Sequence, residues 1–225
     1  MIDLSKVQKR TTADIAKRIV QDIPDGAHVN LGIGQPMTIS NYLPSDKEIL
    51  LHSENGLLGM GPLAKDHEID EELVNAGKQP VTMLPGASLC HHADSFVMIR
   101  GGHIDICVLG AFQVSVKGDI ANWRTGDPKA IPAVGGAMDL ALGAKKLFVM
   151  MEHLTKSGES KLVKECTYPL TALAAVDCIY TDLATIAVTP QGLVAVDWVD
   201  GISFENLQAL SGVPMIQRSE EHTSE

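Results

Sequence analysis

Short apolar runs alternate with helical patterns over the first two thirds of this chain. Thr11 or Thr12 can cap a first helix, because the apolar residues that follow fall on one helical face. Those residues are Ile15, Ile19 and Val20. Strands are predicted at residues 28–31, 48–52, 81–84, 104–109 and 147–151, and another helix at residues 137–142. Strands that alternate with helices predict an α/β fold with an open, mostly parallel sheet flanked by helices.

The last third of the chain has a different spacing. Apolar runs at residues 178–181, 186–189 and 193–198 are separated by tight turns, which predicts C-terminal antiparallel hairpin strands. Ser203 can cap a final helix. No repeat or linker divides the chain, so residues 1–217 are predicted to form one domain and residues 218–225 a disordered polar tail.

Composition narrows the class of protein. The 225 residues are 45% hydrophobic and carry a net charge of −10, as in a soluble globular protein. An acidic chain is a poor match for nucleic acid or an anionic membrane, so neither is expected as a partner. No apolar run reaches membrane-spanning length, the N-terminus lacks a secretory pattern, and the four cysteines form no C-x-x-C pair. We therefore expect a cytoplasmic protein without disulfides.

Several familiar motifs are missing. Met37 stands where a dinucleotide-binding loop that begins at Gly32 needs its third glycine, and no phosphate-binding P-loop occurs. Leu51 stands where a serine-hydrolase elbow needs glycine. His91-His92 and Asp94 have no third ligand at a telling spacing, which favours a surface or supporting role over a metal site. No metal is expected.

One carboxylate stands out, in the segment Ser53-Glu54-Asn55-Gly56. Glu54 ends an apolar strand and precedes a loop with three glycines and a proline. In open parallel sheets the ligand crevice lies at the carboxyl ends of the strands, and glycines there let a ligand approach the backbone. The residues alone leave two interpretations equally open, a catalytic carboxylate or a simple turn cap.

A set of motifs along the chain resolves this choice. The motifs are Asn30-Leu31-Gly32-Ile33-Gly34, Ser53-Glu54-Asn55-Gly56, Asn75-Ala76-Gly77-Lys78, Leu84-Pro85-Gly86-Ala87, Ile99-Arg100-Gly101-Gly102-His103 and Gly135-Gly136-Ala137-Met138-Asp139-Leu140. Together and in this order they resemble the second, or B, subunit of the class I CoA-transferase family. The similarity runs from the first helix to Ile216.

The resemblance implies a ping-pong reaction in which Glu54 is the nucleophile and becomes a glutamyl-CoA thioester. It implies that the N–H of Gly136, or of Gly135 as second choice, stabilises the oxyanions. Both glycines could also simply shape the start of the following helix. No cofactor is expected, because the CoA thioester is itself a substrate. An A subunit is implied as an obligate partner, in a heterodimer or heterotetramer. Further substrate- or CoA-binding residues expected from the family pattern are Gly34, Asn55, Gly135 and Arg124.

Residues 91–96, 111–119, 154–161 and 210–214 resemble the branch of this family that acts on 3-oxoadipate. That branch implies transfer of CoA from succinyl-CoA to 3-oxoadipate in the breakdown of aromatic compounds. The loop with Arg124 and Lys129 departs from acetoacetate-using relatives, so either cation is a candidate for the far carboxylate, with His91-His92 as a second candidate. Three alternatives stay open: another short 3-oxoacid such as acetoacetate, a non-catalytic binding subunit, or a thioester hydrolase on the same fold.

Overall fold

The structure is a computed structural model that describes residues 4–126, 129, 131–132 and 134–218. Residues 219–225, the greater part of the predicted polar tail, lie outside the described residues.

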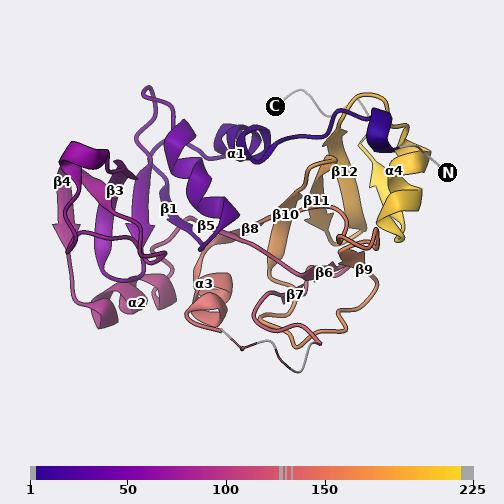
Figure 1. Ribbon diagram of the computed structural model, residues 1–225. Coiled ribbons are helices and arrows are strands. Elements are labelled where there is room, and N and C mark those ends of the chain that lie inside the picture. Colours follow the sequence, from indigo (N-terminus) through magenta and orange to yellow (C-terminus); the bar gives the residue numbers. More distant parts are fainter. Residues whose placement is uncertain (1–3, 127–128, 130, 133, 219–225) are drawn as a thin grey trace.

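The described residues form a ten-stranded sheet with the order β13-β12-β11-β10-β8-β5-β1-β2-β3-β4 (Figure 1). The neighbours from β10 to β2 run parallel, and antiparallel pairs flank them on both sides. Its strands are β1 (His28–Leu31), β2 (Leu50–Ser53), β3 (Leu57–Leu63), β4 (Val81–Leu89), β5 (Ile106–Leu109), β8 (Lys146–Met150), β10 (Val176–Tyr180), β11 (Ala184–Thr189), β12 (Gly192–Trp198) and β13 (Met215–Gln217). The predicted open α/β sheet with C-terminal hairpin strands is confirmed.

Helices and a small second sheet cover the two faces of the large sheet (Figure 1). One face packs against α1 and η2, and the other against α2, α3, α4 and the small sheet. The remaining bounds are η1 (Leu4–Lys6), α1 (Thr12–Gln21), η2 (Gln35–Tyr42), η3 (Asp66–Glu68), α2 (His92–Arg100), α3 (Ala137–Gly143) and α4 (Phe204–Ser211), with β6 (Gln113–Ser115), β7 (Ile120–Ala121) and β9 (Leu162–Val163) in the small sheet.

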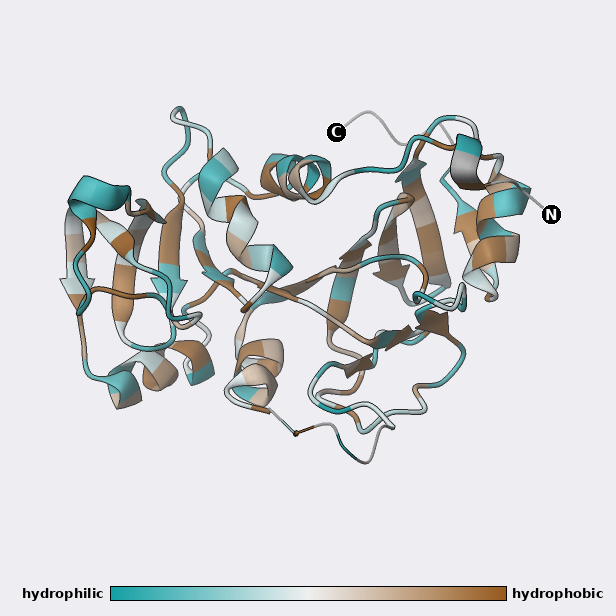
Figure 2. Cartoon of the chain, in the orientation of Figure 1, coloured by the Kyte–Doolittle hydropathy of each residue, from teal (hydrophilic) through white to brown (hydrophobic). Residues whose placement is uncertain are grey.

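Strand β5 is a continuous apolar run because both of its faces are buried. Ile106 and Val108 belong to the core on the α1 face, whereas Cys107 and Leu109 belong to the core on the opposite face. A parallel strand covered on both sides is typically apolar along its length. Figure 2 shows the same pattern, with hydrophobic residues along the central strands and hydrophilic residues on the outer side of α1.

The predicted helix caps are present. The Thr11 hydroxyl accepts a hydrogen bond from the Asp14 N–H, and the Asp14 carboxylate accepts one from the Thr11 N–H, which completes a capping box. Ile15 and Ile19 of α1 are fully buried, as their spacing predicted. Ser203 caps α4 in the same way by accepting from the Asn206 N–H.

The prediction that residues 57–62 form a loop was wrong. These residues belong to β3, which pairs antiparallel with β2 and β4. The glycines make room for β4 rather than for a ligand: a Cβ on Gly59 would lie 2.9 Å from the Cα of Ala87, and one on Gly61 would collide with Thr82. Glu54 therefore lies in a hairpin turn.

Two other elements were not anticipated. Strand β4 continues through Pro85 to Leu89, which is tolerated because β4 is an edge strand and proline needs no ladder donor there. Helix α2 was missed because it has a weak apolar periodicity. Only Ser95 and Ile99 of this helix are buried, and Val97 is 64% exposed.

Candidate active site

Glu54 lies in a tight turn directly after β2. The Gly56 N–H donates to the Ser53 carbonyl at 2.9 Å, which closes the turn between β2 and β3. Gly56 has φ +115°, and a side chain there would collide with the Cys90 carbonyl. Glycine is therefore required at this position, both for its left-handed conformation and for the close approach of the backbone before α2.

A pocket of about 410 Å³ opens at the carboxyl ends of the parallel strands. Glu54 after β2, Gly32 after β1, Gly110 after β5 and Met151 after β8 all line it. This is the edge at which open α/β sheets bind their ligands. The position predicted for Glu54 from its strand end is the position that the structure gives it.

Gly135 and Gly136, which precede α3, also line this pocket. Gly135 has φ +49°, and a Cβ on Gly136 would lie 2.7 Å from the Phe96 ring. The Ala137 N–H is used within the turn, because it donates to the Val134 carbonyl. The structure thus brings Glu54 and both predicted oxyanion donors to one pocket, and their catalytic roles stay predictions.

A buried hydrogen-bond network holds the Glu54 side chain from behind. The Asn30 amide nitrogen lies 3.1 Å from Glu54 Oε2 and 3.1 Å from His52 Nδ1. His52 Nε2 lies 2.8 Å from the Ser95 hydroxyl oxygen. Asn30, His52 and Ser95 are each at most 1% exposed. Because Asn30 presents its NH₂ to the carboxylate, it can orient Glu54 with a charge-assisted hydrogen bond.

The electrostatics of this network favour a neutral histidine. Burial lowers the pKa of His52 to about 4, and the nearby His28 lowers it further. In a neutral imidazole one nitrogen accepts and the other donates, so Nδ1 accepts from Asn30 and Nε2–H donates to Ser95. The Cys107 thiol donates to the side-chain oxygen Oδ1 of Asn30 at 3.8 Å, and burial raises the pKa of the thiol. Cys107 is therefore a buried, unreactive thiol.

Three other predicted site residues do not line the pocket. Gly34 has φ +95° and precedes η2, and its neighbours Ile33 and Gln35 reach the pocket. Asn55 is exposed and donates to the Val74 carbonyl at 2.7 Å. Arg124 is exposed. Their binding roles stay predictions.

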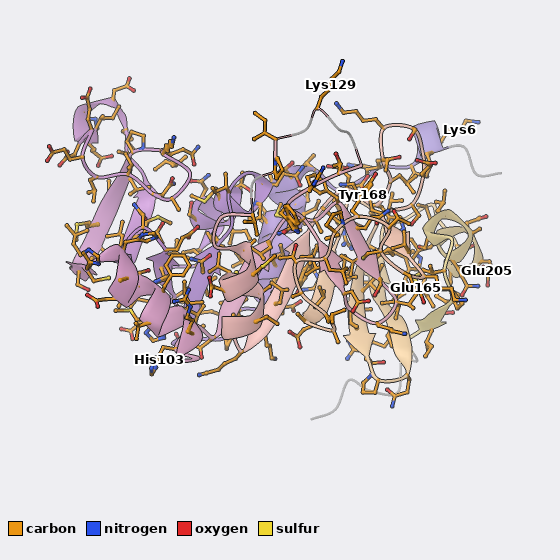
Figure 3. The ribbon with its side chains drawn as sticks, turned by 90° about the horizontal axis from the view of Figure 1, so that it is seen from below. Lys6, His103, Lys129, Glu165, Tyr168 and Glu205 are labelled. Atoms are coloured by element: carbon orange, nitrogen blue, oxygen red, sulfur yellow. The ribbon has the colours of Figure 1, made fainter. Side chains whose placement is uncertain are left out.

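The predicted second cation site and the loop lysine also lie elsewhere. His91 caps α2 by accepting from the Ala93 N–H, and the His92 ring packs edge-on against Phe96. Lys129 projects away from the body of the molecule (Figure 3). Among the described residues, no cluster of three or more histidine, cysteine, aspartate or glutamate side chains could hold a metal ion.

Sequence reasoning missed two charged residues of the pocket, Glu152 and Lys161. Burial raises the pKa of the Glu152 carboxyl, and the neighbouring Asp182 raises it further. Burial lowers the pKa of the Lys161 ammonium. Both are distant from Glu54 in sequence, and the fold brings them to the pocket that Glu54 lines. Within the described part of the chain, no helix has the length and apolar character needed to cross a membrane.

Comparison with known proteins agrees with this geometry. The sequence model of the coenzyme A transferase family matches residues 12–203. The chain belongs to this family of enzymes.

Its relatives include the B subunit of 3-oxoadipate CoA-transferase from Pseudomonas putida, 63% identical over 93% of this chain and 98% of that protein. The corresponding protein from Acinetobacter baylyi is 58% identical over 94% of this chain and 98% of that protein. The resemblance stated from the motifs is therefore confirmed.

Solved structures show the same fold at low sequence identity. An acyl-CoA transferase from Escherichia coli O157:H7 has a TM-score of 0.74 at 16% identity and covers 94% of this chain. This chain spans only 42% of that longer protein. Glutaconate coenzyme A-transferase from Acidaminococcus fermentans has a TM-score of 0.63 at 15% identity, with 95% of this chain and 91% of that chain covered.

Proposed function

We propose that this chain is the catalytic-glutamate subunit of a two-subunit enzyme that moves CoA from succinyl-CoA to 3-oxoadipate. The observation that carries the proposal is the position of Glu54, which lines a pocket at the carboxyl ends of β1, β2, β5 and β8 together with Gly135 and Gly136. The relatives from Pseudomonas and Acinetobacter, named as B subunits of 3-oxoadipate CoA-transferase, support the choice of acceptor.

The first half-reaction loads CoA onto Glu54. A carboxylate oxygen of Glu54 attacks the thioester carbon, the C–S bond breaks, and CoA leaves as a thiolate with the electron pair. The thiolate then attacks the Glu54 carbonyl carbon of the mixed anhydride. The anhydride C–O bond breaks, succinate leaves, and a glutamyl-CoA thioester remains. A carboxylate nucleophile suits this exchange, because the enzyme thioester and the substrate thioester are close in energy.

The second half-reaction runs in the opposite direction. A carboxylate of 3-oxoadipate attacks the glutamyl thioester and expels the CoA thiolate, which gives a second mixed anhydride. The thiolate attacks the acyl carbonyl of that anhydride, releases the Glu54 carboxylate and forms 3-oxoadipyl-CoA. No net proton is taken up, so the pocket needs no general base. It must hold donors where the oxyanions form, and the N–H groups of Gly136 and Gly135 are the proposed donors.

The A subunit is the proposed partner, and the complex is proposed to work in the cytoplasm. Relatives that match this chain over 98% of their length are named as B subunits. The longer Escherichia coli acyl-CoA transferase contains more than twice the length that this chain covers. We propose that the A subunit supplies the part of the CoA site that this chain lacks.

The test uses the complex co-produced with its A subunit. After incubation with succinyl-CoA, hydroxylamine or borohydride trapping followed by peptide mass mapping should modify Glu54. Glu54→Gln should abolish the modification and nearly all turnover while the fold is kept, and Glu48→Gln, an exposed glutamate before β2, should behave as wild type. Near-normal transfer by the Glu54→Gln complex would show that the proposal is wrong.

Acetoacetate is the second candidate acceptor. A Helicobacter pylori protein named as the B subunit of succinyl-CoA:3-ketoacid coenzyme A transferase is 46% identical over 86% of this chain. A panel of 3-oxoacids assayed with succinyl-CoA separates the two candidates. Release of CoA without an acceptor would instead indicate a thioester hydrolase, and absence of both reactions a non-catalytic binding protein.

A further inference from the structure

Lys161 is fixed at the wall of the pocket that contains Glu54. It immediately precedes β9 of the small sheet, and its backbone is hydrogen-bonded on both sides. The Lys161 N–H donates to the His153 carbonyl at 3.1 Å, and the Val114 N–H donates to the Lys161 carbonyl at 3.0 Å. Among the described residues that line this pocket, Lys161 is the only one with a basic side chain. Its place is therefore set by the fold.

The Lys161 ammonium has unused hydrogen-bonding capacity. It donates to the Ala111 carbonyl at a long distance of 3.4 Å, and no ion pair joins it to a described residue. A lysine ammonium has three donors, so a ligand in the pocket can accept from it. Lys161 is half-buried, and this burial lowers the pKa of its ammonium. A carboxylate from a ligand would offset that loss of hydration.

The neighbouring acids are already engaged with other groups. Asp182, which is 2% exposed, accepts from Lys9 at 2.9 Å and from the His153 N–H at 2.7 Å. Glu152 accepts from the Gln35 side chain at 3.4 Å. Neither acid forms an ion pair with Lys161, so its ammonium stays available to a ligand, and both acids favour the charged form of the lysine.

Lys161 and Glu54 line one pocket, whose lining also includes the apolar side chains of Phe112, Met150 and Met151. A short methylene chain can lie against these side chains. Its reacting carboxylate would then be at Glu54 and its other carboxylate at Lys161.

We propose that Lys161 binds the distal carboxylate of a dicarboxylic acid substrate and so sets the preference of this pocket for dicarboxylates. The inference rests on the proposed function, because it assumes that the acid reacts at Glu54. It assigns to Lys161 the role that the sequence suggested for Arg124, Lys129 or His91-His92. A charge-assisted hydrogen bond of this kind corresponds to about tenfold to a hundredfold in affinity.

The experiment compares succinate with butyrate, which has a methyl group in place of the distal carboxylate. Binding of each acid to the two-subunit complex is measured by calorimetry at low ionic strength. The Glu54→Gln background prevents turnover and removes the like charge beside the reacting carboxylate. We expect succinate to bind about tenfold to a hundredfold more tightly than butyrate. Lys161→Met should bring succinate to the level of butyrate and leave butyrate unchanged, and Lys161→Arg should recover part of the preference.

Two control variants make the result specific. Lys164→Met removes an exposed lysine three residues away, and Arg124→Met removes the cation suggested by sequence. Both should keep the succinate preference. The inference is overturned if neither acid binds, if succinate shows no preference, if the preference survives Lys161→Met, or if this variant weakens both acids equally.

Failure of the inference and of the proposed function are distinguishable. Transfer of CoA from succinyl-CoA to 3-oxoadipate by the wild-type complex tests the transferase reaction, and succinate binding by the Glu54→Gln complexes tests the role of Lys161. A complex that transfers CoA but binds succinate independently of Lys161 contradicts the inference alone. A complex that binds succinate through Lys161 but transfers no CoA contradicts the proposed function alone.

Discussion

Replacing Asn30 by alanine should slow both half-reactions without unfolding the protein. Asn30 is fully buried and donates to Glu54 Oε2 at 3.1 Å. A hydrogen bond to a charged group contributes about 1.5–3 kcal/mol. If the bond is needed to orient the nucleophile, its loss should lower the rate of Glu54 thioester formation by about tenfold to a hundredfold.

The same substitution also has a cost in stability that must be separated from the effect on rate. Asn30→Ala leaves the buried His52 Nδ1 without its donor, which should lower the free energy of unfolding by about 1–3 kcal/mol. Cys107→Ala is the matched control. Cys107 is also fully buried and contacts Asn30, but at the side-chain oxygen Oδ1. The Cys107→Ala variant therefore keeps the hydrogen bond from the Asn30 amide nitrogen to Glu54.

The assay is rapid-quench measurement of enzyme-bound CoA for each half-reaction, with urea unfolding of the same complexes. Asn30→Ala should slow loading and unloading by similar factors, because the Glu54 carboxyl takes part in both. Cys107→Ala should lose stability with little change in either rate. The reasoning is refuted if Asn30→Ala keeps rates within about twofold of wild type, or if Cys107→Ala slows the reaction as much.

Two further predictions concern the pH dependence of stability and the behaviour of the chain without its A subunit. Burial lowers the pKa of His52 and of His153 to about 4, so below pH 6.5 the unfolded chain binds more protons than the folded one. The contribution of each neutral histidine to the free energy of unfolding should be fully present above about pH 6.5 and should fall by about 3 kcal/mol by pH 4. Urea unfolding that gives the same free energy across this pH range would contradict the prediction. Without its A subunit the chain should transfer no CoA, and it should self-associate in light scattering because Leu89 and Val97 are 66% and 64% exposed. CoA transfer by the purified single chain would contradict the first expectation. A monodisperse monomer in light scattering would contradict the second.

The central strands could be predicted from sequence because both of their faces are buried. In β5 and in residues 147–150 of β8, successive side chains enter the hydrophobic cores on opposite faces of the sheet, so these segments are unbroken apolar runs. In β1 the buried Asn30 interrupts the run. Strand β3 offers no such signal. Its glycines and Pro62 read as a loop, but Gly59 and Gly61 are the residues that let β4 approach closely. Glycine is required at these two positions because of β4, a strand that is distant in sequence.

The same distinction explains which parts of the site could be found. Glu54 and Gly135-Gly136 belong to local motifs, so the sequence identified them before their shared pocket was visible. Lys161 ends the stretch 154–161 that resembles the 3-oxoadipate branch, but that resemblance assigned it no role, and only the fold places it at the pocket. Arg124 drew attention because its loop departs from a family pattern, yet it is exposed. A cation that binds a buried carboxylate must itself be partly dehydrated and lie near the nucleophile, and these are properties of the folded chain. The proposed preference for dicarboxylic acids therefore depends on how the fold places Lys161 and Glu54 in one pocket, and local motifs do not encode this placement.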